Sequence, residues 1–507
     1  MHRRRFLGLA AVGAAATLLP RSLDAAGDIE LEELTIAELR KFSAVALTQA
    51  YLARIDAVDK HGPRLNSVIE LNPDALDIAR ALDAERAAGK MRGPLHGIPI
   101  LIKDNIDTAD RMHTTAGSLA LSENIAARDA GLVVRLRSAG AIILGKTNLS
   151  EWANFRSTHS TSGWSGRGGL TLNPYALDRN CCGSSSGTGA AIAASLAAAG
   201  VGSETDGSIV CPSSACALVG IKPTLGVISG SGIIPISHSQ DTAGPMARTV
   251  EDAAILLAAM SEDDGLKPVL HPDGLKGARI GVARKYFGFN DHVDDLMKDA
   301  LDAIKGLGAT LVDPADMETT GKYDDTELEV LLYEFKADLN KYLAALSPAV
   351  KSRTLADLIK FNEENRAREM PFFGQELFER AQKKGPLTEA AYKKALAKNH
   401  RMSRAEGIDA VMKKHKLDAL VAPTGGPMWP TDLVNGDHFT GGFSTASAVA
   451  GYPHVTVPAG QVFGLPVGIS FFAGANSEAT LIKFAYAFEQ ATKARRKPSY
   501  APGIRTI

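Results

Sequence analysis

Short runs of apolar and β-branched residues recur along this chain, and stretches of helical character separate them. Runs of this length suit β-strands, and strands that alternate with helices are typical of an α/β architecture. We therefore expect an α/β fold whose sheet is covered by helices. The runs that carry this expectation span residues 98–102, 141–144, 419–422, 455–457 and 467–472.

Residues from about 265 to 416 are richer in Lys, Glu and Asp than the rest and have a mainly helical pattern. Within this region Leu331, Phe335, Leu339 and Leu343 recur at the spacing of one helix face. No linker rich in Pro, Gly or Ser separates the region from its neighbours. The sequence thus predicts one large domain in which residues 265–416 form a helical cover.

Two helix boundaries are predicted from local signals. A capping box that begins at Thr35 predicts a helix through about Asp59. An alanine-rich stretch over residues 190–199 predicts a second helix that ends at Gly200. The serine cluster just before this stretch is expected to cap its N-terminus.

The composition is that of a globular protein and excludes several function classes. The chain has 507 residues, of which 45% are hydrophobic and 22% charged. Lys+Arg number 56 against 57 Asp+Glu, so there is no basic excess that would indicate a nucleic-acid partner. The 12 histidines include no His-x-x-x-His pair, so we expect no zinc site.

The four cysteines do not form a recognisable framework. Cys181 and Cys182 are adjacent, and Cys211 and Cys216 are five residues apart. Neither spacing is a metal-binding motif, and so few cysteines in so long a chain are not a disulfide scaffold. We therefore expect them to be mostly buried and reduced.

The N-terminus has the layout of a bacterial export signal. A basic start at residues 2–5 precedes a weakly apolar run over 6–19, and small residues follow up to Ala26. The adjacent Arg3 and Arg4 resemble the twin-arginine signal that exports folded proteins. We therefore expect residues 1–26 to be a signal peptide and the mature protein to be periplasmic or secreted, without a stable membrane association. A basic amphipathic tail is the alternative.

Two glycine-rich motifs are misleading. Residues 140–147 match the phosphate-binding pattern G-x-x-x-x-G-K-[ST], but the four middle residues are Ala, Ile, Ile and Leu, which indicate a strand. Residues 183–187 match G-x-S-x-G, with Ser185 as the nucleophile of an α/β-hydrolase elbow. That elbow requires a strand upstream, whereas residues 173–180 have the composition of a loop.

A third stretch, residues 202–212, suits nucleophilic catalysis. Its small residues leave backbone N–H groups able to form an oxyanion hole, and the hydroxyl of Ser208 follows the turn. A serine nucleophile needs a base, and the nearest histidine in the sequence lies 30 residues after Ser208. Lys103 follows the apolar run 98–102, where burial would lower its pKa and favour the neutral amine.

Together these stretches resemble the amidase signature family of serine hydrolases. The match extends from about residue 34 to residue 495, and its segments occur in the order that is typical of the family. The resemblance implies the amidase signature fold, a single large domain over residues 27–507 with a large mixed β-sheet covered by helices on both faces. The matching segments are 97–105, 145–151, 182–187, 202–212 and 241–245.

The resemblance also implies a Ser-Ser-Lys triad and an acyl-enzyme intermediate. Ser208 matches the nucleophile, Lys103 matches the general base, and Ser184 matches a bridging serine whose peptide bond is cis. Backbone N–H groups of Thr205, Asp206 and Gly207, together with that of Ser208, would form the oxyanion hole. No metal or cofactor is required by this chemistry.

Two departures from the family pattern bear on the substrate. Where many members have Gly-Gly-Ser-Ile-Arg, this chain has Asp206 at the first position and Val210 at the last. Aspartate tolerates the left-handed backbone region, so we expect Asp206 to keep the turn intact. Loss of the arginine removes a group suited to gripping a carboxylate, which favours a neutral substrate.

The aspartate variant resembles most the bacterial peptide amidases, which release the C-terminal amide of peptides as ammonia. An amidated peptide or small amide is therefore the expected substrate, without an obligate protein partner. A broad-range aryl or acyl amide hydrolase is the alternative. The glutaminase subunit of a tRNA amidotransferase fits less well with an export signal, and a non-catalytic binding protein would not need all three triad residues.

Overall fold

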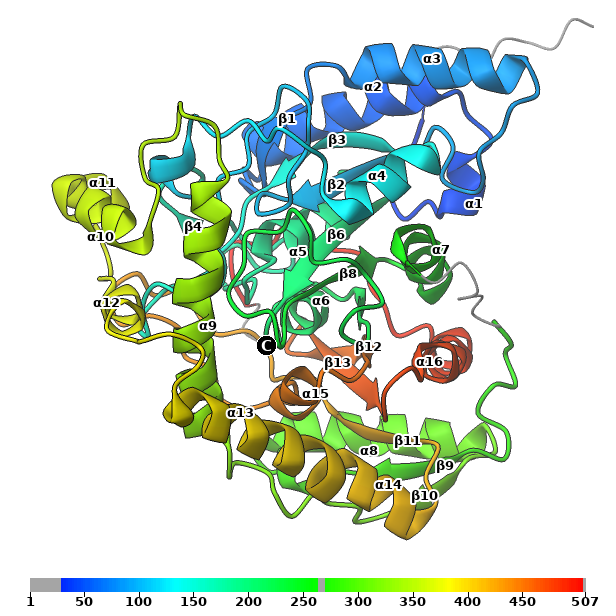
Figure 1. Ribbon diagram of the computed structural model, residues 1–507. Coiled ribbons are helices and arrows are strands. Elements are labelled where there is room, and N and C mark those ends of the chain that lie inside the picture. The colour runs from blue at the N-terminus through cyan, green and yellow to red at the C-terminus, as the bar shows by residue number, and fades with distance from the viewer. Residues whose placement is uncertain (1–28, 263–269, 505–507) are drawn as a thin grey trace, which may run out of the picture.

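An eleven-stranded mixed β-sheet forms the centre of the computed structural model, which describes residues 29–262 and 270–504. The strand order is β1-β3-β2-β6-β8-β7-β12-β13-β11-β9-β10, and it runs from the top to the bottom of Figure 1. The strands are β1 (Val68–Leu71), β2 (Pro99–Lys103), β3 (Ile142–Thr147), β6 (Ala199–Glu204), β7 (Val219–Lys222), β8 (Thr242–Ala247), β9 (Arg279–Val282), β10 (Thr310–Val312), β11 (Ala419–Pro423), β12 (His454–Val462) and β13 (Leu465–Phe472), while β4 (Trp164–Ser165) and β5 (Gly169–Leu170) form a separate ribbon.

The pairing of β2 brings two strand ends together. β2 lies parallel to β3 on one side and parallel to β6 on the other, with Ile102 opposite Val201. β6 in turn pairs antiparallel with β8. Because β2 and β6 run in the same direction, the segments that follow them emerge at one edge of the sheet. All five predicted strand runs are confirmed as β2, β3, β11, β12 and β13, each with a buried core.

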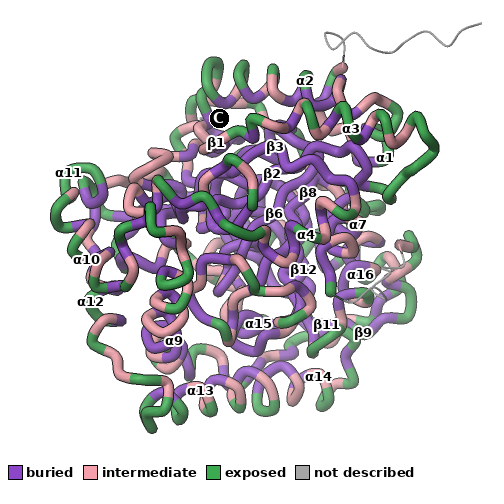
Figure 2. The backbone as a smooth tube through the Cα atoms, turned by 45° about the horizontal axis from the view of Figure 1, so that its top comes forward, coloured by how far each residue is buried: buried purple, intermediate pink, exposed green. Residues whose placement is uncertain are grey.

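Helices flank the sheet, as expected for an α/β fold. α4, α7, α16 and α8 contact one another in series on one side, whereas α5 and α6 pack together on the other (Figure 1). Figure 2 shows that the backbone is buried along the central strands and exposed on the outer helices. The helices are α1 (Ile36–Leu39), α2 (Ala44–Arg54), α3 (Ala75–Ala87), α4 (Gly131–Ser138), α5 (Ser186–Ala193), α6 (Val210–Ala215), α7 (Val250–Met260), α8 (Asp291–Gly306), α9 (Asp324–Ala344), α10 (Leu355–Glu364), α11 (Arg366–Glu369), α12 (Glu376–Gln382), α13 (Ala390–Ser403), α14 (Asp409–His415), α15 (Thr445–Ala450) and α16 (Glu478–Thr492).

The region 265–416 contains α8 to α14 together with β9 and the edge strand β10, which join the main sheet. α9 carries the predicted apolar face, and the residues of that face lie in an apolar cluster separate from the main core. That cluster includes Trp152 and Phe155, which follow β3. The helical cover is thus attached to the sheet through the segments that follow its strands.

Two helix boundaries differ from the prediction. The capping box at Thr35 is present, but α1 ends at Leu39 because Ser43 caps a new helix, accepting a bond from Ala46 N at 3.1 Å. The alanine-rich helix begins earlier, at Ser186, and ends at Ala193. Residues 199–204 are strand β6 instead, since pairing with two neighbours in the sheet overrides the helix propensity of alanine.

The predicted signal peptide, residues 1–26, lies outside the described residues. Within the described ranges, none of the helices combines the length and the apolar character that a membrane crossing would require.

Candidate active site

Lys103 is the last residue of β2 and is completely buried. Its Nζ lies 2.8 Å from Ser184 Oγ, 3.0 Å from Ser203 O and 3.0 Å from Ser203 Oγ. Burial lowers the pKa of Lys103 from 10.5 to about 7, although the carboxylates of Glu204 and Asp241 act in the opposite direction. The amine is therefore able to lose its proton near neutral pH.

A neutral amine can make all three contacts of Lys103. Such an amine has two N–H donors and one lone pair. The two donors fit the carbonyl and hydroxyl oxygens of Ser203, which leaves the lone pair for the hydroxyl of Ser184. Asn105 also donates to Ser203 Oγ, at 2.9 Å, and so fixes that hydroxyl.

Ser184 lies in the loop before α5 and is completely buried. Its peptide bond with Gly183 is cis, as the family resemblance implies. A side chain at position 183 would bring a Cβ within 2.2 Å of Ser150 Oγ, so the loop requires glycine there. Ser184 O accepts a bond from Ser150 N at 3.0 Å, which holds the loop against the segment after β3.

Ser208 lies in the turn between β6 and α6. It is 8% exposed, whereas Lys103 and Ser184 are 0% exposed, so Ser208 is the member of the group nearest to solvent. Ser185 N donates to Ser208 O at 3.2 Å, which joins the loop of Ser184 to this turn. The contact between Lys103 and Ser184 and the backbone bond between Ser185 and Ser208 thus bring the segments of the three predicted triad residues together.

The predicted oxyanion residues form the start of the same turn. Among the described residues, no acceptor takes a hydrogen bond from the N–H groups of Thr205, Asp206 or Gly207. The residue with left-handed backbone geometry is Gly207, with φ +77°, and not Asp206 as expected from the sequence. The backbone conformation therefore does not explain the aspartate at position 206. Its side chain does have a partner, since Oδ2 accepts a bond from Thr445 Oγ1 at 2.7 Å.

Buried side chains hold this turn from two sides. Glu204 Oε2 accepts bonds from the N–H groups of Ile209, at 2.7 Å, and Val210, at 3.1 Å, and so caps α6. Thr205 Oγ1 donates to Asp241 Oδ1 at 2.6 Å. Burial raises the pKa of Glu204, and it raises the pKa of Asp241 to about 6.

Gln240 connects the turn to the helical cover. Its amide donates to Thr205 O at 3.2 Å and to Glu327 Oε1, on α9, at 2.9 Å. Burial raises the pKa of Glu327, and the neighbouring carboxylate of Asp206 raises it further. Gln240 thus joins the cover to the turn through the two hydrogen bonds that its amide donates.

Val210, at the position where many family members have arginine, is completely buried at the start of α6. No guanidinium therefore projects from this position. Such an absence removes a bidentate partner for a substrate carboxylate.

The two misleading motifs have the local structure that the sequence indicated: a strand in the first and a loop upstream of the second. Residues 142–147 of the phosphate-like pattern are strand β3, and Lys146 Nζ is bonded to Ile106 O at 2.7 Å. Ser185 follows a loop and not a strand, and its Oγ donates to Ser203 O at 3.2 Å. The expected capping of α5 by serine is wrong, because Ser185 occupies the cap position without a side-chain cap bond.

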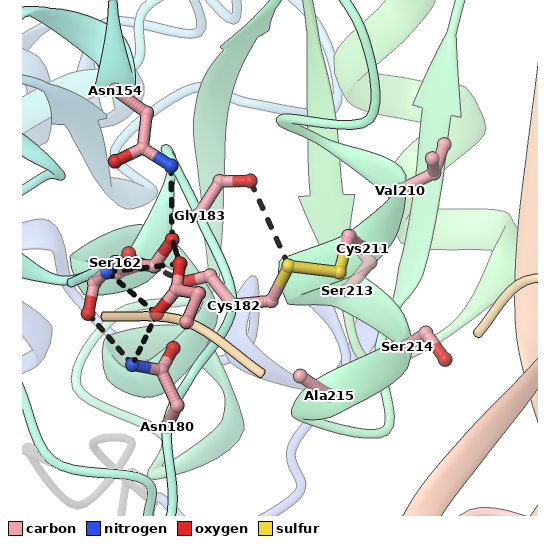
Figure 3. The surroundings of a disulfide bond; sticks show 12 residues. Asn154, Ser162, Asn180, Cys182, Gly183, Val210, Cys211, Ser213, Ser214 and Ala215 are labelled. Carbon is pink, nitrogen blue, oxygen red and sulfur yellow. Dashed lines mark hydrogen bonds between the residues drawn. A yellow bond between two sulfur atoms is a disulfide. The ribbon is translucent and has the colours of Figure 1, made fainter. Parts of the chain in front are cut away.

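The expectation of reduced cysteines is wrong for two of the four. Cys182 and Cys211 form a disulfide, with Cα atoms 5.9 Å apart (Figure 3). Cys181 and Cys216 are free and buried. The disulfide joins one cysteine of each sequence pair, so the spacing within either pair did not indicate it.

Sequence reasoning missed Ser203, Gln240 and the carboxyl role of Glu204. Ser203 lies near the end of β6, parallel to β2, so a serine there could have been recognised as a neighbour of Lys103 if the strand register had been known. Within the described chain, residues with the spacing of a metal site are His238, Glu334 and Asp338. Glu334 already accepts bonds from Ser237, Ser239 and Tyr392.

Comparisons with known proteins agree with this architecture. The Amidase family model matches residues 46–482. A probable amidase from Arabidopsis thaliana is 41% identical over 496 residues, which cover 93% of this chain and 92% of the relative. The structure of native peptide amidase from Stenotrophomonas maltophilia is 48% identical, with a TM-score of 0.87, and the match covers 93% of this chain and 99% of that one.

A structure of peptide amidase in complex with the competitive inhibitor chymostatin is also 48% identical, with a TM-score of 0.88, over 93% of this chain and 100% of that one. Both the sequence and the fold therefore match over almost the whole length. The chain belongs to the amidase signature family and is an amidase, a hydrolase of carbon–nitrogen bonds in amides.

Proposed function

We propose that this amidase hydrolyses C-terminally amidated peptides through a triad of Lys103, Ser184 and Ser208. The observation that carries the proposal is the 2.8 Å contact between the buried Nζ of Lys103 and Ser184 Oγ. A buried lysine with a lowered pKa, beside a hydroxyl, is the arrangement that general-base catalysis needs.

The reaction begins with neutral Lys103. Its lone pair takes the proton of Ser184 Oγ, which takes the proton of Ser208 Oγ as that oxygen attacks the amide carbonyl carbon. The N–H groups of Thr205, Asp206 and Gly207 stabilise the negative oxygen of the tetrahedral intermediate.

Collapse of the intermediate breaks the carbon–nitrogen bond. The proton returns from Lys103 through Ser184 to the departing nitrogen, which leaves as ammonia, and Ser208 keeps the acyl group as an ester. Water then attacks the ester and gives its proton to the same relay, which releases the carboxylic acid and restores both serines.

Two observations support the proposed substrate class: the absence of a cation at position 210 and the similarity to peptide amidase structures. The buried Val210 leaves no cation at the position where many relatives have arginine, which suits a terminal carboxamide better than a carboxylate. The likeness to peptide amidase structures, at 48% identity, supports the same choice.

Ammonia release tests this function. We expect the purified enzyme to release ammonia from an amidated dipeptide faster than it cleaves an N-acyl anilide of equal concentration. A preference for the anilide would favour the broad-range aryl or acyl amide hydrolase. Turnover of neither compound would favour a binding protein.

We further propose that the protein is exported in the folded state through its twin-arginine-type N-terminus. Arg3 and Arg4 are the residues that support this. Replacement of both by lysine should retain the protein in the cytoplasm, measured by fractionation of a bacterial host. Unchanged appearance in the periplasm would show that this route is not used.

A further inference from the structure

The two serines of the proposed triad lie on different segments: Ser184 in the loop before α5, and Ser208 in the turn between β6 and α6. Two links join this loop directly to the turn and to α6. One is the backbone bond from Ser185 N to Ser208 O, at 3.2 Å. The other is the disulfide between Cys182 and Cys211. Ser184 and Ser208 are thus flanked by a non-covalent link on one side and a covalent link on the other.

The disulfide is close to both serines along the chain. Cys182 precedes Ser184 by two residues, and Cys211 follows Ser208 by three. Cys211 lies in the first turn of α6, where its N–H donates to Gly207 O at 2.8 Å. Figure 3 shows the bond passing from the loop to this helix. A shift of the loop relative to α6 would therefore separate the reacting hydroxyls.

The loop conformation is one that needs to be held. Cys182 has φ +55°, in the left-handed region that residues with a side chain rarely adopt. Such a conformation persists only where its surroundings impose it. Besides the disulfide, these surroundings include the bond from Ser186 Oγ to Cys182 O at 2.6 Å, which lies within the loop and helix α5 and does not reach α6.

The four cysteines differ in their access to solvent. Cys182 and Cys211 are 7% and 8% exposed, close to the value of Ser208. Cys181 and Cys216 are 0% exposed. A thiol reagent or a redox protein thus has some access to the disulfide, while the other pair stays shielded.

We propose that the Cys182–Cys211 disulfide positions Ser184 against Ser208, so that oxidation of these two thiols switches the amidase on. The inference rests on the proposed triad. In the oxidation the two thiols lose two protons and two electrons to the disulfide of a thiol–disulfide oxidoreductase, whose own cysteines become thiols. A protein that folds in a reducing compartment and then enters an oxidising one would be inactive until it arrives.

Reduction of the folded enzyme tests the proposal. Wild-type enzyme is treated with dithiothreitol under native conditions, and intact mass after alkylation confirms that two cysteines have opened. We expect kcat for an amidated dipeptide to fall roughly 10- to 100-fold, as for a misplaced reacting group, while KM changes little. Reoxidation with oxidised glutathione should restore kcat.

Two double variants complete the design. Cys181→Ala with Cys216→Ala keeps the disulfide, so we expect wild-type kcat and the same response to dithiothreitol. Cys182→Ala with Cys211→Ala should have a low kcat that dithiothreitol does not change further. If this variant does not fold, the wild-type reduction decides alone.

The inference fails if reduced wild-type enzyme, with both thiols alkylated, keeps more than half of its kcat. It also fails if reduction lowers only the melting temperature and leaves kcat at 25 °C unchanged, since that would be a structural role. Oxidised enzyme that hydrolyses no amide would overturn the proposed function and this inference together.

Discussion

The residues of the proposed triad differ in solvent exposure, and each exposure fits the role proposed for that residue. Ser208, the proposed attacking group, is 8% exposed, while Lys103 is completely buried. Burial stabilises the neutral amine, and an attacking oxygen has to reach the substrate. The same two residues therefore supply the sharpest tests at this scale.

Replacement of Ser208 by alanine should lower kcat by roughly 10⁴- to 10⁶-fold, as deletion of a nucleophile does elsewhere. The small side chain leaves no cavity of consequence, so circular dichroism and melting temperature should stay near wild type. Ser185→Ala serves as the matched control and should be milder than Ser184→Ala. A Ser208→Ala enzyme with a tenth of wild-type activity would contradict the role of this residue.

The rate should depend on pH through Lys103. Below its pKa of about 7 the amine is charged and cannot accept a proton, so kcat/KM should rise with pH and level off above that value. Asp241→Asn removes a negative charge that raises the pKa of Lys103, so the midpoint should move to lower pH. A flat profile from pH 5 to 9, measured with an amidated dipeptide, would exclude a titrating lysine.

The residues proposed to react are easier to find in the sequence than the residues that hold them. Lys103, Ser184 and Ser208 lie in ordered motifs that can be read without coordinates. Ser203 contacts Lys103 only because β6 lies parallel to β2, and Cys182 meets Cys211 only because a loop packs on α6. Such contacts depend on strand register and on loop packing. Neither can be read from the spacing of residues along the sequence.

Among the elements, α6 has the most direct effect on the site because its first turn follows Ser208. The helix has six residues and depends on capping from outside. Glu204, at the end of β6, supplies that cap to Ile209 and Val210. The boundary between α5 and β6 was predicted less well than the strands themselves. The alanine-rich stretch was expected to be helical up to Gly200, whereas α5 ends at Ala193 and β6 begins at Ala199.

Removal of the cap should therefore disturb catalysis through α6. In Glu204→Ala two buried N–H groups lose their acceptor, at a cost of about 1–3 kcal/mol. We expect kcat to fall while KM changes less, because the turn with Ser208 is displaced. Glu204→Gln keeps an acceptor oxygen and should recover most of the kcat; equal loss in both variants would mean that the negative charge, and not the cap, is what matters.

At the scale of the whole molecule, several ionisable groups are buried in the core and shifted toward their neutral forms. Burial lowers the pKa of Lys103 to about 7 and that of Lys222 to about 8. It raises the pKa of Asp107 and Asp252 to about 6. The α/β fold and its strands were predictable from periodicity, but these shifts were not, because they arise from which side chains the packed layers enclose.

These shifts predict how stability changes with pH. A lysine whose pKa is lowered on folding binds fewer protons in the folded state than in the unfolded state, between the folded pKa and 10.5. Stability then rises with pH in that window, by up to about 1.4 kcal/mol per pH unit for each lysine. The buried aspartates work in the opposite direction, but their contribution is complete above pH 6.

The melting temperature should consequently rise between pH 7 and pH 9, because the two lysines outweigh the buried thiol of Cys181, whose raised pKa acts in the opposite direction. Calorimetry at fixed ionic strength measures this directly. Lys222→Met removes one of the two lysines without touching Lys103, so its melting temperature should rise less steeply over the same range. A wild-type melting temperature that falls steadily from pH 7 to 9 would contradict the prediction, because it would mean that these amines keep their protons in the folded protein.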